Sequence, residues 1–149
     1  MGLNDGLVYG SHFTDGSVDN YAGTVGATIN GSPVNTSDKN GNSDSALDFP
    51  SGSDFISLDN NIINVDSFCV SCWINTSHIS DTSFFIGGRT NYAFLQLGLK
   101  GSKISFIIEN ETNRIIEVNF NTNSELPTLQ NDTWYFICLN AVSEDQFDL

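Results

Sequence analysis

Short apolar stretches separated by turn residues dominate this sequence. Runs of five to eight mostly apolar residues alternate with clusters of Gly, Asn, Asp and Ser along the chain. These four residue types favour turns, because they tolerate unusual backbone angles or hydrogen-bond to their own backbone. Short runs between turns are typical of β-strands. Only Asn60–Asp66 suggests a helix, and that segment is short, so the sequence predicts an all-β protein.

The expected strands follow from these runs and from the alternation of apolar and polar positions. They are Leu7–Phe13, Thr24–Ile29, Ser45–Phe49, Asp54–Leu58, Ser67–Asn75, Ser83–Gly87, Ala93–Leu99, Lys103–Glu109, Ile115–Phe120 and Thr133–Ala141. Turn-like segments at 99–103 and 109–114 make residues 94–120 a three-strand meander. Residues 31–45 are expected to form a polar loop. We therefore expect an antiparallel β-sandwich that forms a single domain over residues 1–149.

The charge balance excludes two classes of partner. Lys and Arg number 5 against 18 Asp and Glu, which gives a formal net charge of −13. Binding to nucleic acid or to an anionic membrane surface needs clustered basic residues, and the sequence has none. No apolar run approaches the roughly 20 residues that span a bilayer, and no signal peptide is visible. Sugars, cations and other protein surfaces remain as partners.

Cys69 and Cys72 form a Cys-x-x-Cys pattern within an expected strand. Successive side chains of a strand point to opposite faces, so these two thiols could neither form a disulfide nor ligate one ion together. A redox pair would also need a helix that starts after the first cysteine. We therefore interpret Cys72, and Cys138 in a later strand, as small core residues. Three thiols without a fixed pairing indicate reduced cysteines.

The order of several motifs resembles a known superfamily. They are "LVYGSHFTDGSVDNYAG" (7–23), "GNSDSALDFPSGSDFISL" (41–58), "FCVSCWINTS" (68–77) and "NDTWYFICLNA" (131–141). The second is similar to a Gly-x-x-x-x-Ala-Leu-x-Phe pattern and the third to a Phe-x-Val-Ser-x-Trp-Ile strand. This order resembles the laminin-G-like (LamG-like), concanavalin A-type lectin and glucanase superfamily. The resemblance implies an all-β concanavalin A-like jelly roll.

The sequence departs from the superfamily pattern in two ways. Members usually continue after the late Trp-containing strand with a turn and a further strand, whereas this chain stops at "VSEDQFDL". We expect the C-terminal strands to be missing or to be supplied by another chain, in a homo-oligomer or a larger assembly, because open sheet edges promote association. The glucanases of the superfamily also carry a Glu-x-Asp-x-Glu-type strand, which this chain lacks.

Two ligand sites are candidates. Asp15, Asp19 and Asn20 offer oxygen ligands beside glycines, which suits calcium, and the superfamily often binds calcium near such turns. Ordinary turn formation is the alternative interpretation of these three residues. For carbohydrate, loop aromatics that stack on sugar faces and polar side chains that bind hydroxyls are the usual requirement. The candidate carbohydrate-binding residues are Tyr21, Arg89, Asn91 and Tyr92. A simple connection between strands is the alternative interpretation of residues 87–94, because turns ordinarily have this composition.

Catalysis is not expected. Glu109 and Glu111 are the nearest pair of carboxylates on one face, but they flank a turn beside Arg114, where solvated charge is the ordinary expectation. His12 and His78 are isolated, and no nucleotide-binding glycine pattern is present.

These observations favour a non-catalytic adhesion or glycan-binding module on an assembled surface. A virion component, such as a phage head-fibre, decoration or tail protein, would reach the outside without a signal peptide. A purely structural assembly subunit and a degenerate glycoside hydrolase are the alternatives.

Overall fold

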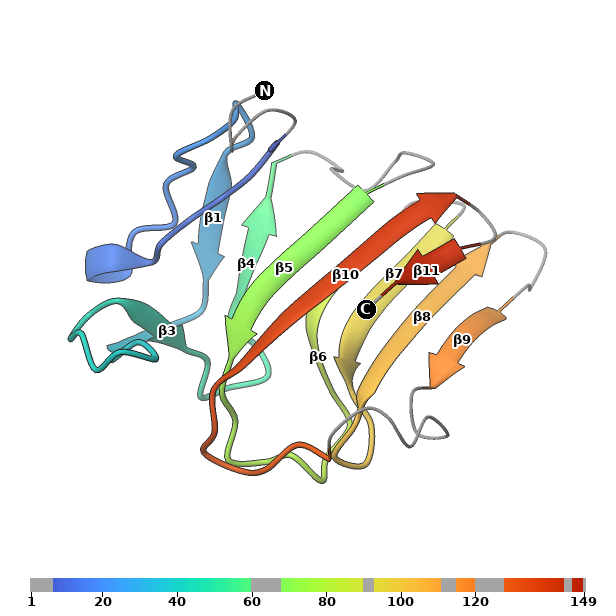
Figure 1. Ribbon diagram of the computed structural model, residues 1–149. Coiled ribbons are helices and arrows are strands. Elements are labelled where there is room, and N and C mark those ends of the chain that lie inside the picture. Colours follow the sequence, from blue (N-terminus) through green and yellow to red (C-terminus); the bar gives the residue numbers. More distant parts are fainter. Residues whose placement is uncertain are drawn as a thin grey trace. The chain divides into compact units, whose positions relative to one another are not determined.

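The computed structural model describes residues 7–59, 68–89, 93–110, 115–119, 128–143 and 146–148. The chain divides into two compact units, residues 1–64 and residues 65–149. Every strand pairing within them is antiparallel, and the only helical element among the described residues is one short 3-10 helix (Figure 1). The prediction of an all-β protein with antiparallel sheets is confirmed. The prediction of a single domain over residues 1–149 stays a prediction.

The first unit contains two separate pairs of short strands. Strand β1 (Ala27–Asn30) pairs with β4 (Phe55–Leu58), and β2 (Val34–Thr36) pairs with β3 (Ala46–Asp48). The 3-10 helix η1 (Thr14–Gly16) precedes them in a long segment without strands. Strand β2 lies inside the stretch predicted to be a polar loop, so that part of the prediction was wrong.

The expected strand Leu7–Phe13 is also wrong, because this segment adopts no strand. Its backbone groups bond to a neighbouring loop instead of to a strand ladder. The N–H of Gly10 donates to Asn20 Oδ1 at 3.1 Å, and the carbonyl of Gly10 accepts from the N–H of Tyr21 at 3.0 Å. Phe13 then takes a left-handed backbone conformation with φ 56°, which ends any extended run before η1.

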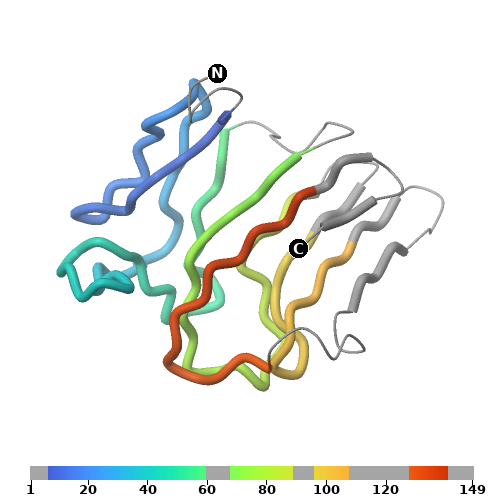
Figure 2. The backbone as a smooth tube through the Cα atoms, viewed as in Figure 1, coloured from blue at the N-terminus to red at the C-terminus, as the bar shows by residue number. Residues whose placement is uncertain are grey.

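The second unit contains a three-stranded and a four-stranded sheet. In the first, β10 (Tyr135–Ser143) lies between β5 (Phe68–Ile74) and β11 (Gln146–Asp148). The second has the order β6 (Ser83–Arg89), β7 (Ala93–Leu99), β8 (Ile104–Asn110) and β9 (Ile115–Asn119). The predicted meander over 94–120 is confirmed in β7, β8 and β9. The backbone trace in Figure 2 follows β5 and β10 side by side, as their pairing requires.

Alternation along the strands of the second unit places one apolar face in a core. Leu97, Leu99 and Phe106 are at most 1% exposed, and Leu139 of the other sheet is fully buried. Residues from both sheets meet in one cluster, where Tyr135 of β10 packs against Leu99 of β7 and its buried neighbours. Burial of such side chains contributes about 1.5–3 kcal/mol each, so this core stabilises the second unit.

Some predicted elements fall outside the described ranges. The short helical candidate Asn60–Asp66 lies outside them, as do residues 111–114 of the predicted turn at 109–114. Across the described residues, no helix has the length and apolar character needed to cross a membrane.

Candidate functional site

The face of the β5–β10 pair that points away from the core carries two exposed aromatic side chains and two thiols. We call it the outer β5–β10 face. Residues alternate between half-buried and exposed along β5, which separates the two faces of that strand. The outer face consists of Cys69, Ser71 and Trp73 from β5 and Phe136, Cys138 and Asn140 from β10. Val70 and Cys72 point the other way, opposite Leu139 and Ile137.

Two aromatic side chains lie next to each other on the outer β5–β10 face. Trp73 is directly opposite Phe136 in the strand register, and their ring centroids are 5.3 Å apart at an interplanar angle of 49°. Trp73 is 47% exposed and Phe136 is 55% exposed. Aromatic cross-strand pairs stabilise a sheet, yet rings this exposed also offer apolar surface to a ligand. Ser71 and Asn140 add hydroxyl and amide groups on the same face.

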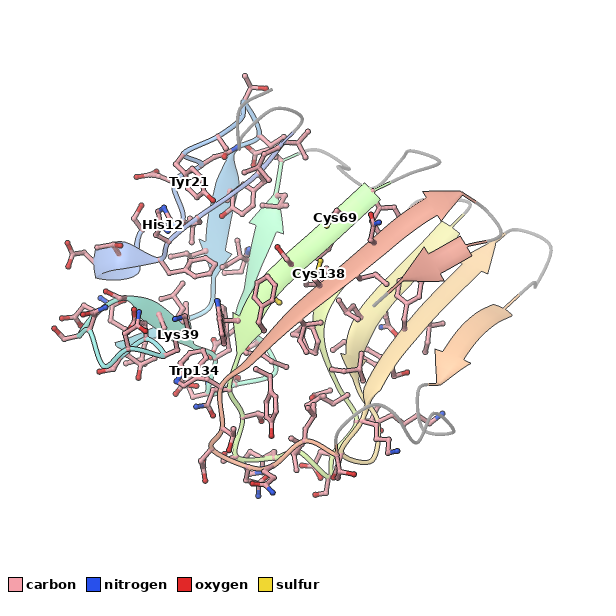
Figure 3. All side chains as sticks on the ribbon, in the orientation of Figure 1. His12, Tyr21, Lys39, Cys69, Trp134 and Cys138 are labelled. Atoms are coloured by element: carbon pink, nitrogen blue, oxygen red, sulfur yellow. The ribbon has the colours of Figure 1, made fainter. Side chains whose placement is uncertain are left out.

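Two thiols meet on the same outer face. Cys69 is exposed, Cys138 is half-buried, and their Sγ atoms are 3.7 Å apart (Figure 3). The prediction that Cys138 is a core residue was wrong, because the register places it opposite Ser71 and therefore outward. The prediction that Cys69 and Cys72 point to opposite faces is confirmed. All three cysteines are free thiols.

The thiol of Cys72 should make the folding stability depend on pH. Burial raises the pKa of Cys72 from its usual value of 9.0 to about 11. The unfolded chain loses this proton near the usual pKa while the folded chain keeps it, so stability is full below pH ~9 and falls as the pH rises towards ~11. The shift corresponds to a loss of about 2–3 kcal/mol.

Urea unfolding at about pH 8 and about pH 10.5, for the wild type and for Cys72→Ala, measures this effect. The wild type should lose more stability between the two pH values than the variant does. Because other groups also ionise in this range, only the difference between the two proteins reports on Cys72. Parallel losses in both proteins would contradict the assignment.

In the first unit, Tyr21 is half exposed and already packed. Its ring stacks on the imidazole of His12, with centroids 4.5 Å apart and an interplanar angle of 9° (Figure 3). The phenol end of Tyr21 lies against Gly10, where an added Cβ would come within 2.7 Å of the ring. Tyr21 is 51% exposed, so this predicted sugar-binding residue presents a ring fixed by its neighbours. The carbohydrate assignment itself stays a prediction.

The three candidate calcium ligands have different surroundings. Asn20 Oδ1 accepts hydrogen bonds from the backbone N–H groups of Gly10, Ala22 and Gly23, so its oxygen faces three amides. Asp19 accepts a hydrogen bond from the Ser17 hydroxyl at 2.7 Å, and Asp15 lies in η1. Within the described part of the chain, no group of three or more His, Cys, Asp or Glu residues is placed to hold a metal ion. Calcium binding stays a prediction.

Several other predicted residues lie at the end of a described strand or outside the described residues. Arg89 ends β6, and its backbone is opposite Phe94. Asn91 and Tyr92 lie outside the described residues, as does Glu111. Glu109 belongs to β8, opposite Ile115. His78, which the sequence presents as isolated, lies 3.8 Å from Asp81 at a highly exposed turn.

The outer β5–β10 face was missed at the level of sequence. Its signal is present, because Cys69, Ser71 and Trp73 alternate with apolar residues, as do Phe136, Cys138 and Asn140. Joining the two runs needs the register of strands more than sixty residues apart, since the pairing of Cys69 and Cys138 spans 69 residues.

Comparisons of the chain with protein-family models, with curated proteins and with solved structures give no match.

Proposed function

We propose that this chain is a non-catalytic glycan-binding module that uses the outer β5–β10 face. The exposed Trp73–Phe136 pair is the observation that supports this proposal. Apolar faces of sugar rings stack on exposed aromatic side chains, while hydroxyl and amide groups beside the rings fix the orientation of the sugar. Ser71 and Asn140 supply such groups on this face.

The net charge narrows the class of sugar. A formal charge of −13 repels sulfated, sialylated or uronic acid chains, so the proposed ligand is a neutral glycan. The proposed fold is the concanavalin A-like jelly-roll sandwich of the LamG-like superfamily. It is supported by the antiparallel sheets and by the position of the "FCVSCWINTS" motif on β5. The proposed setting is a surface assembled from many chains, such as a virion.

Affinity electrophoresis through gels containing neutral or acidic polysaccharides tests this function. Neutral polysaccharides should retard the protein, and Trp73→Ala or Phe136→Ala should weaken the interaction about tenfold, since truncating a central aromatic contact costs more than 1 kcal/mol. Phe49→Ala is the matched control, because Phe49 is 42% exposed in the other unit. Equal retardation of the wild type and both outer-face variants would contradict the proposal.

A second candidate function is that of an assembly subunit, in which another protein chain covers the same face. The observation that favours it is the exposure of two adjacent aromatic side chains, since Trp73 and Phe136 are both about half exposed. Light scattering, with calcium and with a chelator, would measure the mass in solution. A defined oligomer that dissociates in Trp73→Ala favours this role. Dissociation on chelation would show that the assembly depends on a divalent cation, for which Asp15, Asp19 and Asn20 are the predicted ligands.

A further inference from the structure

Cys69 and Cys138 lie next to each other on the outer β5–β10 face and not in the core. Cys69 is exposed on β5, Cys138 is half-buried on β10, and only these two of the three cysteines share a face. Their Sγ atoms lie 3.7 Å apart, within thiol–thiol hydrogen-bond distance. In the strand register Cys69 is opposite Asn140 and Cys138 is opposite Ser71, so the two cysteines are diagonal neighbours. Diagonal side chains remain within reach of each other across a sheet.

We propose that Cys69 and Cys138 form a dithiol site that closes reversibly into a disulfide by exchange with small-molecule disulfides. Closure requires the two sulfur atoms to approach from 3.7 Å to about 2.0 Å, a movement that side-chain rotation and a small pucker of the strand pair can supply. The site belongs to the outer β5–β10 face, but the proposal does not depend on glycan binding.

The exchange proceeds in two balanced steps. Cys69, as the exposed thiol, loses its proton and attacks one sulfur of the small disulfide, which forms a mixed disulfide and releases one small thiolate. Cys138 then loses its proton and attacks Cys69 Sγ, which forms the protein disulfide and releases the second small thiolate. The two protons pass to the two released thiolates. The protein dithiol is oxidised and the small disulfide is reduced, so no other oxidant is required.

The exposures of the three cysteines assign their roles. Cys69 is exposed, so a small molecule can approach its sulfur atom. Cys138 is half-buried, and its sulfur atom lies 3.7 Å from that of Cys69, which suits it to attack the mixed disulfide. Cys72 lies on the opposite face of the sheet, opposite buried Ile137, and is therefore excluded from the exchange. Although Cys69 is exposed, partial desolvation at the sheet surface raises its pKa, and the hydrogen bond and the electrostatic interaction with Cys138 raise it further. Exchange should therefore be slow at neutral pH and accelerate as the pH rises.

Incubation of the folded protein with oxidised glutathione, followed by intact mass and peptide mapping, tests the site. The expected product has lost two hydrogen atoms and contains one disulfide that joins the peptides of Cys69 and Cys138. A thiol reductant should restore the starting mass. Cys72→Ser should give the same product, whereas Cys138→Ser should stop at the mixed disulfide on Cys69.

The same reaction in urea provides the control for selectivity. In the unfolded chain all three cysteines are accessible, so pairings that include Cys72 should form there. Three outcomes with the folded protein would overturn the proposal: stable mixed disulfides without loss of two hydrogens, a disulfide that contains Cys72, or disulfides only between separate chains. Circular dichroism of each variant verifies that it is folded. Peptide mapping of the wild-type protein tests the proposal by itself, even if a variant does not fold.

Discussion

Replacement of Gly98 by alanine should lower the free energy of unfolding by about 3 kcal/mol or more. Gly98 is buried in β7 between Phe84 of β6 and Ser105 of β8. A Cβ added there would collide with the carbonyl oxygen of Ser83 and lie 2.7 Å from the Cα of Phe84. These are backbone atoms and cannot rotate away, so β6 and β7 would have to separate and lose hydrogen bonds between them.

Gly88→Ala is the matched control for this substitution. Gly88 lies in β6 of the same hairpin, and an added Cβ there meets nothing within 4 Å. Its replacement should be neutral or stabilising by up to about 1 kcal/mol, because alanine reduces the entropy of the unfolded chain. Urea unfolding followed by tryptophan fluorescence is a suitable measurement, since Trp73 and Trp134 both lie in the second unit. A Gly98→Ala protein as stable as Gly88→Ala would contradict the close approach of β6 and β7.

The fold class and most strands of the second unit could be predicted from the sequence, because alternation is a local signal. The expected strand Ser67–Asn75 contains the observed β5, and the expected Ala93–Leu99 coincides with β7. The strand β11 was missed, because it is only three residues long and pairs with β10 through a register shift. The strand expected at Leu7–Phe13 failed because its hydrogen bonds go to the loop at Asn20 and Tyr21 and not to another strand, which alternation does not reveal.

The positions of the three cysteines could be predicted only in part from the sequence. The alternation of Cys69 and Cys72 between faces needed only the geometry of one strand. The position of Cys138 needed the register of two strands, and a shift of one residue in that register moves every side chain to the other face. Since Tyr135 is opposite Ile74, Cys138 is opposite Ser71 and lies outward beside Cys69. No local pattern in the sequence contains that register.

Replacement of Asn20 by alanine should lower the stability of the first unit by about 2–4 kcal/mol. The side chain of Asn20 joins three parts of this unit through five hydrogen bonds. Its Oδ1 accepts from the N–H groups of Gly10, Ala22 and Gly23, and its Nδ2 donates to the carbonyls of Val8 and Val25 at 2.9 and 3.0 Å. Each such bond contributes about 0.5–1.5 kcal/mol, and water can replace part of the loss at this partly exposed position.

Hydrogen exchange is the direct measurement, because three of the five bonds protect backbone amides. Protection at Gly10, Ala22 and Gly23 should fall roughly 30- to 1,000-fold in Asn20→Ala if that free energy is lost locally, since each 1.4 kcal/mol is about tenfold. Asn20→Asp should also be destabilising, because a carboxylate keeps the three acceptor contacts but repels the carbonyls of Val8 and Val25.

Asn40→Ala supplies the control for loss of an asparagine side chain in the same unit. Asn40 is exposed, and its side-chain oxygen accepts one hydrogen bond from Lys39 Nζ at 3.0 Å, so its replacement should change stability by less than about 0.5 kcal/mol. Unchanged protection at Gly10 in Asn20→Ala would mean that Asn20 does not anchor the N-terminal segment.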